Sequence, residues 1–466
     1  MNPNNSPWIA QLRNTRPIDI LEEDIRADVA IVGAGIAGVM TAYYILKYTD
    51  RSLVIVEGNK VAHGATGHNA GQLVADFERE IIDLVGEYGI QMTADAERDV
   101  RGAWILLEEI FAEANLETPH STFMGYNGYK SIDHLIEEIK ANAIRREAGL
   151  QTYSFYIDEN CPEIKNIPEE LRDLYDLVPQ ANILSLLETE DKDYIGAVAV
   201  KKGCLNSALF SEEVIGFLLS KYIGRVNLFE HSPVESISLD KDKASLSIKT
   251  KMGESHSIMC ERAVLCTNGF ERLNIKNNAG DDINTSFHHM IEGDIGYMAA
   301  YLEELKEPPT ALGYYDQGGY EKDIKSAAYA SDPYFYMTRR PYEHASGQVH
   351  NMVCIGGPEK IIGETQDYER TDPFSKEMGE RIDDFAKATL KKGKAIDLKY
   401  QYQWHGLMCY TPTGMRIIGA EPKNPTLMYN LGCNGVGILP SVFGGWKIAK
   451  LLAGEKFSPS IFDPRR

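Results

Sequence analysis

The chain has few of the residue patterns that build metal centres and disulfide frameworks. Its seven cysteines are scattered over 466 residues, and none forms a Cys-x-x-Cys pair or stands near histidine at zinc-finger spacing. The HExxH and HxE spacings are absent as well, so no metal site is predicted. An odd number of dispersed cysteines is typical of reduced thiols in a cytosolic protein.

Basic charge and membrane-targeting features are also scarce. The 48 lysines and arginines stand against 68 acidic residues, and the formal net charge of −20 disfavours nucleic acid and anionic membranes as partners. Residues 1–6 lack the basic and apolar regions of a signal peptide. The uncharged stretch Val29–Leu46 is long enough to suggest a membrane span. It holds three glycines, however, and each costs a helix about 1 kcal/mol relative to alanine. We therefore expect a cytoplasmic protein without a membrane span.

The same stretch predicts instead the start of a dinucleotide-binding unit. Val29–Val32 is a short apolar run of the kind found in buried parallel strands. After it, Gly33 permits a tight turn, and Gly35 allows the backbone to approach a pyrophosphate. Gly38 allows the following helix to pack close to the strand. The first N–H groups of that helix would face the phosphates.

The segment that follows supports this interpretation. Ser52–Val56 is a second strand-like run, and Glu57 comes directly after it, 19 residues beyond Gly38. This is close to the spacing of about 20 residues expected for a carboxylate that binds a ribose hydroxyl. A solvated acid at a strand end is the alternative for Glu57 alone. The unit by itself is compatible with either NAD or FAD.

Helical and strand-like segments alternate along the rest of the chain. Helical periodicity marks residues 76–115, 131–148, 211–222 and 438–453, and strand-like runs lie at 122–129, 152–157, 226–229, 234–239, 243–250, 256–259, 263–267 and 426–430. The tyrosine-rich stretch 287–400 has strand-like runs at 295–301, 334–339 and 351–356. It predicts an antiparallel sheet that leaves and rejoins the nucleotide domain. The predicted fold class is therefore α/β, with an α+β substrate part.

Four collinear blocks resemble the D-amino-acid-oxidase-like superfamily of FAD-dependent oxidoreductases. The second of them is similar to the GASGRNGG block of γ-glutamylputrescine oxidoreductases. The blocks are Gly33–Glu57, Gly64–Gln72, Pro233–Val234 with Val264–Gly269, and Trp404–Gly437. The resemblance implies a Rossmann-type FAD-binding domain, expected at residues 1–76, 201–286 and 401–466. It also implies an interleaved antiparallel-sheet substrate domain, expected at residues 77–200 and 287–400.

The resemblance also implies which residues bind FAD. N–H groups of the glycine-rich turn at 432–437, with the start of the helix that follows, would stabilise the negative charge of a reduced flavin. A glycine-rich turn before a packing helix is the alternative. The implied cofactor-binding residues are Gly33, Gly35, Ile36, Ala37, Gly38, Glu57, Gly58, Ala65, Thr66, Gly67, His68, Asn69, Gly71, Gln72, Val234, Thr267, Gly269, Gly406, Gly432, Asn434, Gly435, Val436, Gly437 and Ile438.

Two residues depart from the patterns of the superfamily. His68 replaces the arginine of the GASGRN block, and it aligns with a histidine that bonds covalently to the flavin in dimethylglycine-dehydrogenase-like members. We therefore raise covalent FAD at His68 as a hypothesis; the alternative is a histidine that hydrogen-bonds near the flavin or the pyrophosphate. Cys433 stands where relatives often have histidine, which changes a side chain near the flavin edge.

The resemblance indicates the substrate-binding and catalytic residues less clearly. Arg339 lies in a segment similar to the one whose arginine pairs with the substrate carboxylate in glycine oxidases, and a guanidinium suits a carboxylate. A surface arginine on an edge strand is the alternative. Alternation along a strand would point Arg340 to the opposite face. The remaining candidates are His288, His289, Tyr297 and Trp404, for each of which a structural role is the alternative.

The predicted activity is oxidation of a C–N bond in a small amine or amino acid. FAD would take a hydride from carbon, so the protein needs to position and polarise the substrate rather than supply a nucleophile. The electron acceptor would be O₂ or an electron carrier. A 2-hydroxy-acid dehydrogenase of the same superfamily is one rival, for which a base such as His288 or His289 would matter more. A flavin-binding subunit without catalytic activity is the other.

Overall fold

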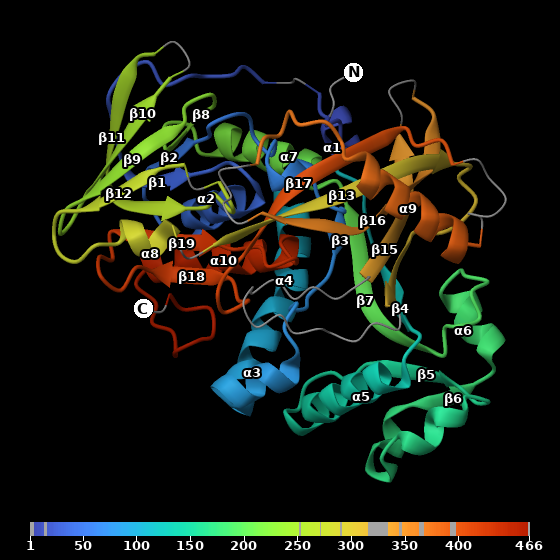
Figure 1. Cartoon of the computed structure of the whole chain (residues 1–466). Coiled ribbons are helices and arrows are strands. Elements are labelled where there is room, and N and C mark those ends of the chain that lie inside the picture. Colours follow the sequence, from blue (N-terminus) through green and yellow to red (C-terminus); the bar gives the residue numbers. More distant parts are fainter. Residues whose placement is uncertain are drawn as a thin grey trace.

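The computed structural model describes residues 4–13, 16–250, 253–270, 272–288, 291–315, 334–343, 347–362, 368–391 and 398–464. Within these residues the strands form a nine-stranded and a ten-stranded sheet. Figure 1 shows the first sheet at the left and the second at the right. Both sheets combine strands from distant parts of the sequence. Residues of both sheets line the space between them.

The first sheet is built around parallel strands. Its main path runs β12 (Asn274–Asn277), β9 (Val234–Leu239), β10 (Ala244–Lys249), β11 (Ser255–Leu265), β1 (Ile25–Val32), β2 (Leu53–Val56) and β8 (Val226–Phe229); β19 (Leu427–Leu431) also pairs with β11, and β18 (Ile417–Ala420) with β19. β11, β1, β2 and β8 are mutually parallel where they pair, and β19 joins β11 in parallel. This order confirms the predicted dinucleotide-binding βαβ unit.

Helices pack on this sheet through apolar faces and close backbone approaches. α2 (Ile36–Tyr48) connects β1 to β2, and α10 (Ile438–Leu452) packs beside it with α4 (Ile90–Ala114) and α7 (Ser207–Lys221) nearby (Figure 1). A Cβ at Gly445 of α10 would lie 2.6 Å from the Met40 backbone, so the α2–α10 contact requires glycine there. The large apolar cluster between these helices and the sheet includes Trp8, Ile31 and Phe443.

The second sheet has an antiparallel half and a mixed half. Its path runs β17 (Tyr402–Tyr410), β13 (Glu292–Glu303), β16 (Val349–Ile362), β15 (Tyr334–Glu343), β14 (Thr310–Tyr315), β4 (His120–Tyr129), β7 (Gly196–Leu205), β5 (Ser154–Asp158) and β6 (Asp176–Val178), with β3 (Gln72–Leu73) on β7. β17 to β14 pair antiparallel, as predicted for 287–400, but β14 and β4 pair in parallel. β7 and β17 carry this sheet across the predicted domain boundaries at 200/201 and 400/401.

The remaining elements lie around the two sheets. α8 (Asn284–His288) contacts β12 of the first sheet, and α9 (Lys376–Thr389) contacts β13 and β16 of the second. The others are α3 (Ile81–Tyr88), α5 (Ile132–Glu147), α6 (Gln180–Leu186) and the 3₁₀ turns Ala65–Gly67, Pro162–Asn166 and Glu169–Leu174. The predicted helical region 76–115 is two helices, because Gly89 with φ +81° breaks α3 from α4. Over the described ranges, every helix is too short or too polar to cross a lipid bilayer.

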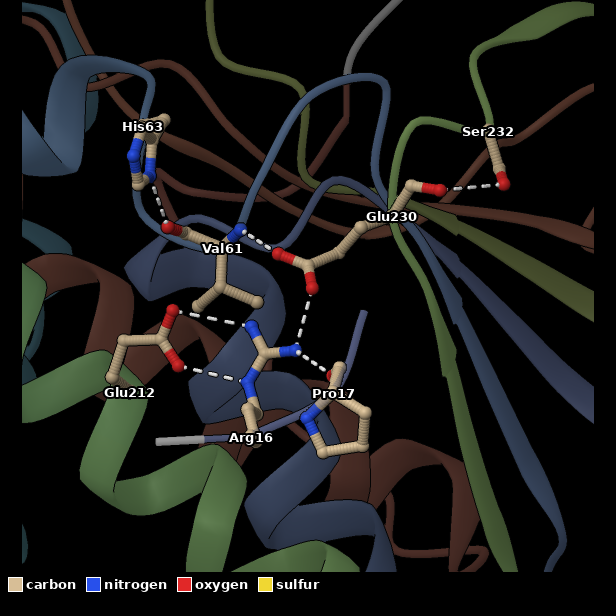
Figure 2. Close-up of polar contacts among 7 residues, drawn as sticks. All are labelled: Arg16, Pro17, Val61, His63, Glu212, Glu230 and Ser232. Carbon is tan, nitrogen blue, oxygen red and sulfur yellow. Dashed lines mark hydrogen bonds and ion pairs between the residues drawn. The ribbon is translucent and has the colours of Figure 1, made fainter. Parts of the chain in front are cut away.

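The N-terminal segment is fixed to the loop that leads toward the site. α1 (Pro7–Ala10) buries Trp8, whose indole Nε1 donates to the Asn69 carbonyl at 2.6 Å. Figure 2 shows Arg16 between the carboxylates of Glu212 and Glu230. Glu230 in turn accepts the Val61 N–H at 2.7 Å. These contacts hold residues 59–72 against the first sheet.

Candidate active site

A cavity of about 1350 Å³ lies between the two sheets. Typical small-ligand pockets measure about 300–1,000 Å³, so this volume has room for a large cofactor together with a substrate. One end is lined by the turn after β1, the end of β2 and the start of α2. The cavity continues past the 64–72 segment and the 433–438 turn to one face of the second sheet.

The first end has the backbone shape predicted for a dinucleotide site. Gly33 has φ +101°, and a Cβ there would lie 2.8 Å from the Cys266 carbonyl oxygen. A Cβ at Gly38 would overlap the Gly33 carbonyl oxygen, so the helix packs on the turn as predicted. α2 has no side-chain cap at Gly35. Thr66 Oγ1 accepts the Ile36 N–H at 2.9 Å. Gly35, Ile36 and Ala37 at this positive helix end line the cavity, which suits an anion.

Glu57 is held in place by two backbone groups. Its carboxylate accepts the Ala34 N–H at 2.9 Å and the Asn59 N–H at 2.8 Å. Burial raises the pKa of Glu57, and the two N–H donors act in the opposite direction. Glu57 lines the cavity one strand away from Gly33, so its position is compatible with the predicted contact to a ribose.

The 64–72 segment places His68 on the cavity wall. Its Nδ1 lies 2.9 Å from the Gly64 carbonyl oxygen, and because a carbonyl can only accept, Nδ1 is the protonated nitrogen. Burial lowers the pKa of His68 to about 4. A Cβ at Gly406 would come within 3.0 Å of His68 Cβ, so β17 passes directly against this segment. The imidazole is therefore neutral, with the Nε2 lone pair free of this bond.

The C-terminal turn forms another wall of the cavity. Gly432, Asn434 and Gly435 all have positive φ, at +86°, +43° and +72°. Asn434 Oδ1 accepts the Thr411 N–H at 2.8 Å, which ties the turn to the end of β17. α10 then begins without a side-chain cap at Gly437. Its N-terminus therefore presents N–H groups to the same cavity, as the resemblance implied.

Most of the predicted cofactor-binding residues line this cavity. The lining residues among them are Gly33, Gly35, Ile36, Ala37, Glu57, Gly58, Ala65, Thr66, His68, Asn69, Gly71, Gln72, Val234, Thr267, Gly406, Gly435, Val436, Gly437 and Ile438. Gly38, Gly67, Gly269, Gly432 and Asn434 do not line it. They shape the backbone behind the wall: a Cβ at Gly269 would lie 3.0 Å from Leu407, and one at Gly432 2.7 Å from Thr411.

Two lining residues of this end were not predicted to bind the cofactor. Arg416 is buried and donates to the Asn430 side chain at 2.7 Å and to the Gly432 carbonyl at 3.2 Å; burial lowers its pKa. Cys433 accepts the Cys409 N–H at 3.3 Å, and its contacts with Cys409 lower its pKa to about 6. For Arg416 the available sequence signal was an arginine two residues after Gly414 in the 413–416 turn.

The predicted substrate residues lie elsewhere. Tyr297 is buried in an apolar cluster on the other face of the second sheet. Trp404 pairs with Met298 on the cavity face, but it is buried in the cluster that holds Trp8, and neither residue lines the cavity. Arg339, 3% exposed, pairs through both terminal nitrogens with Glu188 at 2.6 Å and is also absent from the lining. His288 ends α8 outside the cavity wall. None of these four described residues lines the cavity, and their predicted roles stay predictions; His289 lies outside the described residues.

Carboxyl and phenol groups occupy the substrate end instead. Asp294 on β13 and Glu359 on β16 line the cavity with Tyr334, Tyr336 and Tyr410. Burial raises the pKa of Asp294, and burial together with Asp294 raises that of Glu359. Sequence reasoning missed both acids. For Asp294 the sequence signal was an acid within the otherwise apolar run Gly293–Tyr297. Alternation along a strand places this acid on the face opposite Tyr297.

These features together fit FAD. The glycine turn at one end of the cavity leaves a cradle that a Cβ at Gly33 would fill. The 433–438 turn lines the same cavity, as do the starts of α2 and α10, which have no side-chain cap at Gly35 and Gly437. The residues that would hold the cofactor are those of the 33–38, 57–58, 64–72 and 433–438 segments. The fold and site thus define a dinucleotide-dependent oxidoreductase with two interleaved sheets.

Comparison with known proteins identifies the family. The family model described as FAD dependent oxidoreductase (DAO) matches residues 28–451, and the chain belongs to this family. Glycine oxidase from Geobacillus kaustophilus has the same fold, with a TM-score of 0.66, 15% identity, and coverage of 95% of this chain and 99% of that chain. L-amino acid deaminase from Proteus vulgaris aligns with a TM-score of 0.63, 18% identity, and coverage of 98% and 97%.

A curated relative is similar over a shorter stretch. Gamma-glutamylputrescine oxidoreductase from Escherichia coli (strain K12) is 33% identical over 86 residues, which are 18% of this chain and 20% of that protein. The match spans only about a fifth of the relative. The superfamily predicted from four blocks is confirmed, and the protein is an FAD-dependent oxidoreductase by family.

Proposed function

We propose that the protein oxidises the C–N bond of a small amine or amino acid to an imine. One observation carries this proposal: a single cavity joins the dinucleotide cradle at Gly33 and Glu57 to a sheet face that holds Asp294 and Glu359. A substrate on that face would lie beside the flavin end of the cofactor. Titratable groups next to a redox cofactor suit an amine, because the substrate nitrogen has to lose a proton.

The cofactor and the protein would divide the chemistry between them. When bound, FAD would supply the oxidant that accepts a hydride from the carbon next to nitrogen, and water would hydrolyse the imine that results. The chain contributes position and charge: the N-terminus of α10 stabilises negative charge on the cofactor side. Carboxylates on β13 and β16 accept a proton on the substrate side. The acceptor of the electrons would be O₂ or an electron carrier.

The placement of histidines supports amine oxidation over hydroxy-acid oxidation. A hydroxy-acid dehydrogenase needs a base for the substrate O–H, and His288 was the described candidate. It lies outside the cavity wall. His68 does line the cavity, but its Nδ1 proton is already donated to Gly64 and its pKa of about 4 makes it a weak base.

Anaerobic reduction of the flavin tests the proposal. The holoenzyme is mixed without oxygen with a panel of amines, amino acids and 2-hydroxy acids, and the loss of flavin absorbance is followed. We expect amines or amino acids to bleach the flavin, and hydroxy acids not to. Bleaching by hydroxy acids alone would replace this activity with the dehydrogenase, and bleaching by no compound would favour the non-catalytic subunit.

We also propose that FAD is covalently attached at His68. The support is a neutral imidazole on the cavity wall whose Nε2 lone pair is not used by the Gly64 bond. Acid precipitation followed by peptide mass spectrometry tests this: the flavin mass should stay with the peptide that holds residues 64–72. Recovery of all flavin in the supernatant contradicts covalent attachment, while leaving the proposed oxidation intact.

A further inference from the structure

We infer that the substrate end of the cavity binds an elongated aliphatic amine as its ammonium cation, held by Asp294 and Glu359 and by a row of tyrosines. The inference rests on the proposed function and names its substrate class: an amine without a carboxylate on the carbon that is oxidised. The support comes from the sheet register, the burial of the two acids and the close spacing of the tyrosine rings.

The two carboxyl groups share one face of the sheet. Glu359 pairs with Gly296 across β16 and β13, and Gly296 pairs with Gly406 across β13 and β17. Asp294 precedes Gly296 by two residues, so alternation places it on the same face. All four residues line the cavity. The two adjacent glycines let the His68 backbone and the Met408 side chain approach the sheet closely, and the acids lie beside this contact.

Asp294 in particular lacks a counter-charge. It is 2% exposed, and its carboxyl shares a hydrogen bond with that of Glu359, while its Oδ1 is buried without a hydrogen-bond partner among the described residues. None of the described cavity-lining residues on β13, β15, β16 and β17 is basic. Negative charge on this buried pair of carboxyl groups is costly without a cation. A ligand cation would supply the missing partner, and the carboxylate of an amino acid at the same place would be repelled.

A third carboxylate faces the same space. Glu78 lines the cavity, and a Cβ at Gly435 would overlap its Oε1. Burial, followed by Asp76, raises the pKa of Glu78 to about 7. Acids from three separate segments of the chain therefore lie near the 433–438 turn.

A row of neighbouring tyrosine rings continues from these acids. The ring centroids of Tyr336 and Tyr334 are 5.6 Å apart, those of Tyr334 and Tyr315 are 4.6 Å apart, and those of Tyr315 and Tyr129 are 4.8 Å apart. All four line the cavity, from β15, β14 and β4. Aromatic faces attract ammonium groups and cover alkyl chains. The row leads away from Glu359, so it suits a chain that extends from the amine.

The same arrangement accounts for the proton. The ammonium form has no lone pair, so one N–H proton has to move to a carboxylate oxygen before the carbon loses hydride. The nitrogen lone pair then forms the C=N bond as the C–H bond breaks with its electron pair, and bound FAD is the oxidant. Carboxyl groups with raised pKa values, as for Glu359, hold such a proton better than an ordinary carboxylate.

Matched substrates test the inference on the holoenzyme. Norleucine is pentylamine with a carboxylate added to the carbon that would be oxidised, and ethylamine is too short to reach along the tyrosines. We expect pentylamine to reduce the flavin with a kcat/KM at least 100-fold above that of norleucine and at least 10-fold above that of ethylamine. A norleucine value equal to or above that of pentylamine would overturn the inference while leaving the proposed oxidation standing.

A cation that cannot be oxidised to an imine separates binding from catalysis. Pentyltrimethylammonium should perturb the flavin absorbance, and Asp294→Asn or Glu359→Gln should each raise its Kd at least 10-fold. Glu137→Gln, in an exposed pair with Lys140, is the matched control and should leave the Kd unchanged. Absence of binding to the wild-type protein contradicts the inference. Binding that both variants weaken, with no amine able to bleach the flavin, supports the site and refutes the proposed function.

Discussion

At the scale of the residue, the alternation along β13 determines which side chains can reach a substrate. Asp294, Gly296 and Met298 line the cavity, whereas Tyr297 packs on the opposite face against Phe374 and His405. The sequence predicted a strand at 295–301, but both of its faces are apolar or small. The strand therefore has no polar–apolar alternation that would indicate which of its side chains face the cavity. The strand was therefore predictable, and the residues that face the site were not.

Arg339 was predicted to bind a substrate carboxylate, and its contacts give a different expectation. Arg339→Lys keeps the charge but loses the two-pronged contact with Glu188 and the bond to the Pro308 carbonyl at 2.9 Å. We expect the free energy of unfolding to fall by about 1–2 kcal/mol. KM should change less than about twofold, because the residue does not line the cavity.

Denaturant unfolding and steady-state kinetics of the same preparations measure the two effects. Glu188→Gln serves as the matched partner, and the double variant should lose less stability than the sum of the single variants, because the two residues act on one contact. A large rise in KM for Arg339→Lys without a loss of stability would restore the substrate-binding role.

Gly38 shows how a single missing Cβ supports the cofactor cradle. In Gly38→Ala the new Cβ would overlap the Gly33 carbonyl oxygen, so α2 has to move away from the turn. We expect a loss of about 2–3 kcal/mol in the free energy of unfolding, together with a lower FAD content of the purified protein. Urea unfolding and the ratio of flavin to protein absorbance measure these effects.

The control for this change is another helical glycine. Gly86 lies in α3 with open space around its Cβ position, so Gly86→Ala should stabilise the protein by about 0.5–1 kcal/mol through helix propensity. Equal effects of the two substitutions would show that the close approach at Gly38 is not needed.

At the scale of the element, strong local patterns were predicted well and long-range pairings were not. β2 and β9 lie within one residue of their predicted bounds, and α2 follows the glycine turn as predicted. The apolar periodicity, the glycine turns and the charged residues all indicate the same elements there. β11 was predicted as two strands, 256–259 and 263–267, but it is one strand, Ser255–Leu265, with charged residues between. The first part of β11 pairs with β10, and most of the strand pairs with β1. These partners, which are distant in the sequence, keep the strand extended.

Glu113 connects three helices, and its effect on stability should depend on pH. Its carboxylate accepts from Lys47 on α2 at 2.6 Å, from Lys221 on α7 at 2.8 Å and from Tyr43 at 2.8 Å. Burial raises the pKa of Glu113, but these bonds outweigh it and lower the pKa to about 2. A folded-state pKa below the unfolded value of about 4.3 contributes stability above that value. The contribution is lost as pH falls toward 2.

Glu113→Gln isolates this contribution. At pH 7 the variant should be about 1 kcal/mol less stable than the wild type, since the pairs are partly exposed and salt-screened. The difference should shrink between pH 4.5 and pH 2. Denaturant unfolding at several pH values measures it. A difference that is constant over this range would assign the effect to packing rather than to charge.

At the scale of the whole molecule, the site forms where segments from distant parts of the chain meet. The 33–38 turn, the 64–72 segment, β13, β16 and the 433–438 turn all line one cavity. The resemblance located the cofactor segments because short glycine motifs mark them. The acids and tyrosines of the substrate end lie on strands without such motifs, and their proximity depends on the register of the second sheet.

A cavity shared by both sheets makes the stability of the whole protein depend on FAD. Binding to the folded state alone adds about 2.7 kcal/mol at a free FAD concentration 100 times Kd and about 4.1 kcal/mol at 1,000 times Kd. Apoprotein made under riboflavin limitation should therefore gain Tm as FAD is added, whereas NAD should produce no comparable shift. Hydrogen exchange should show new protection in both the 33–38 and 433–438 turns, because one ligand would contact both. Protection confined to the first turn, or an equal Tm shift with NAD, would mean that the cavity binds a dinucleotide without using its second wall.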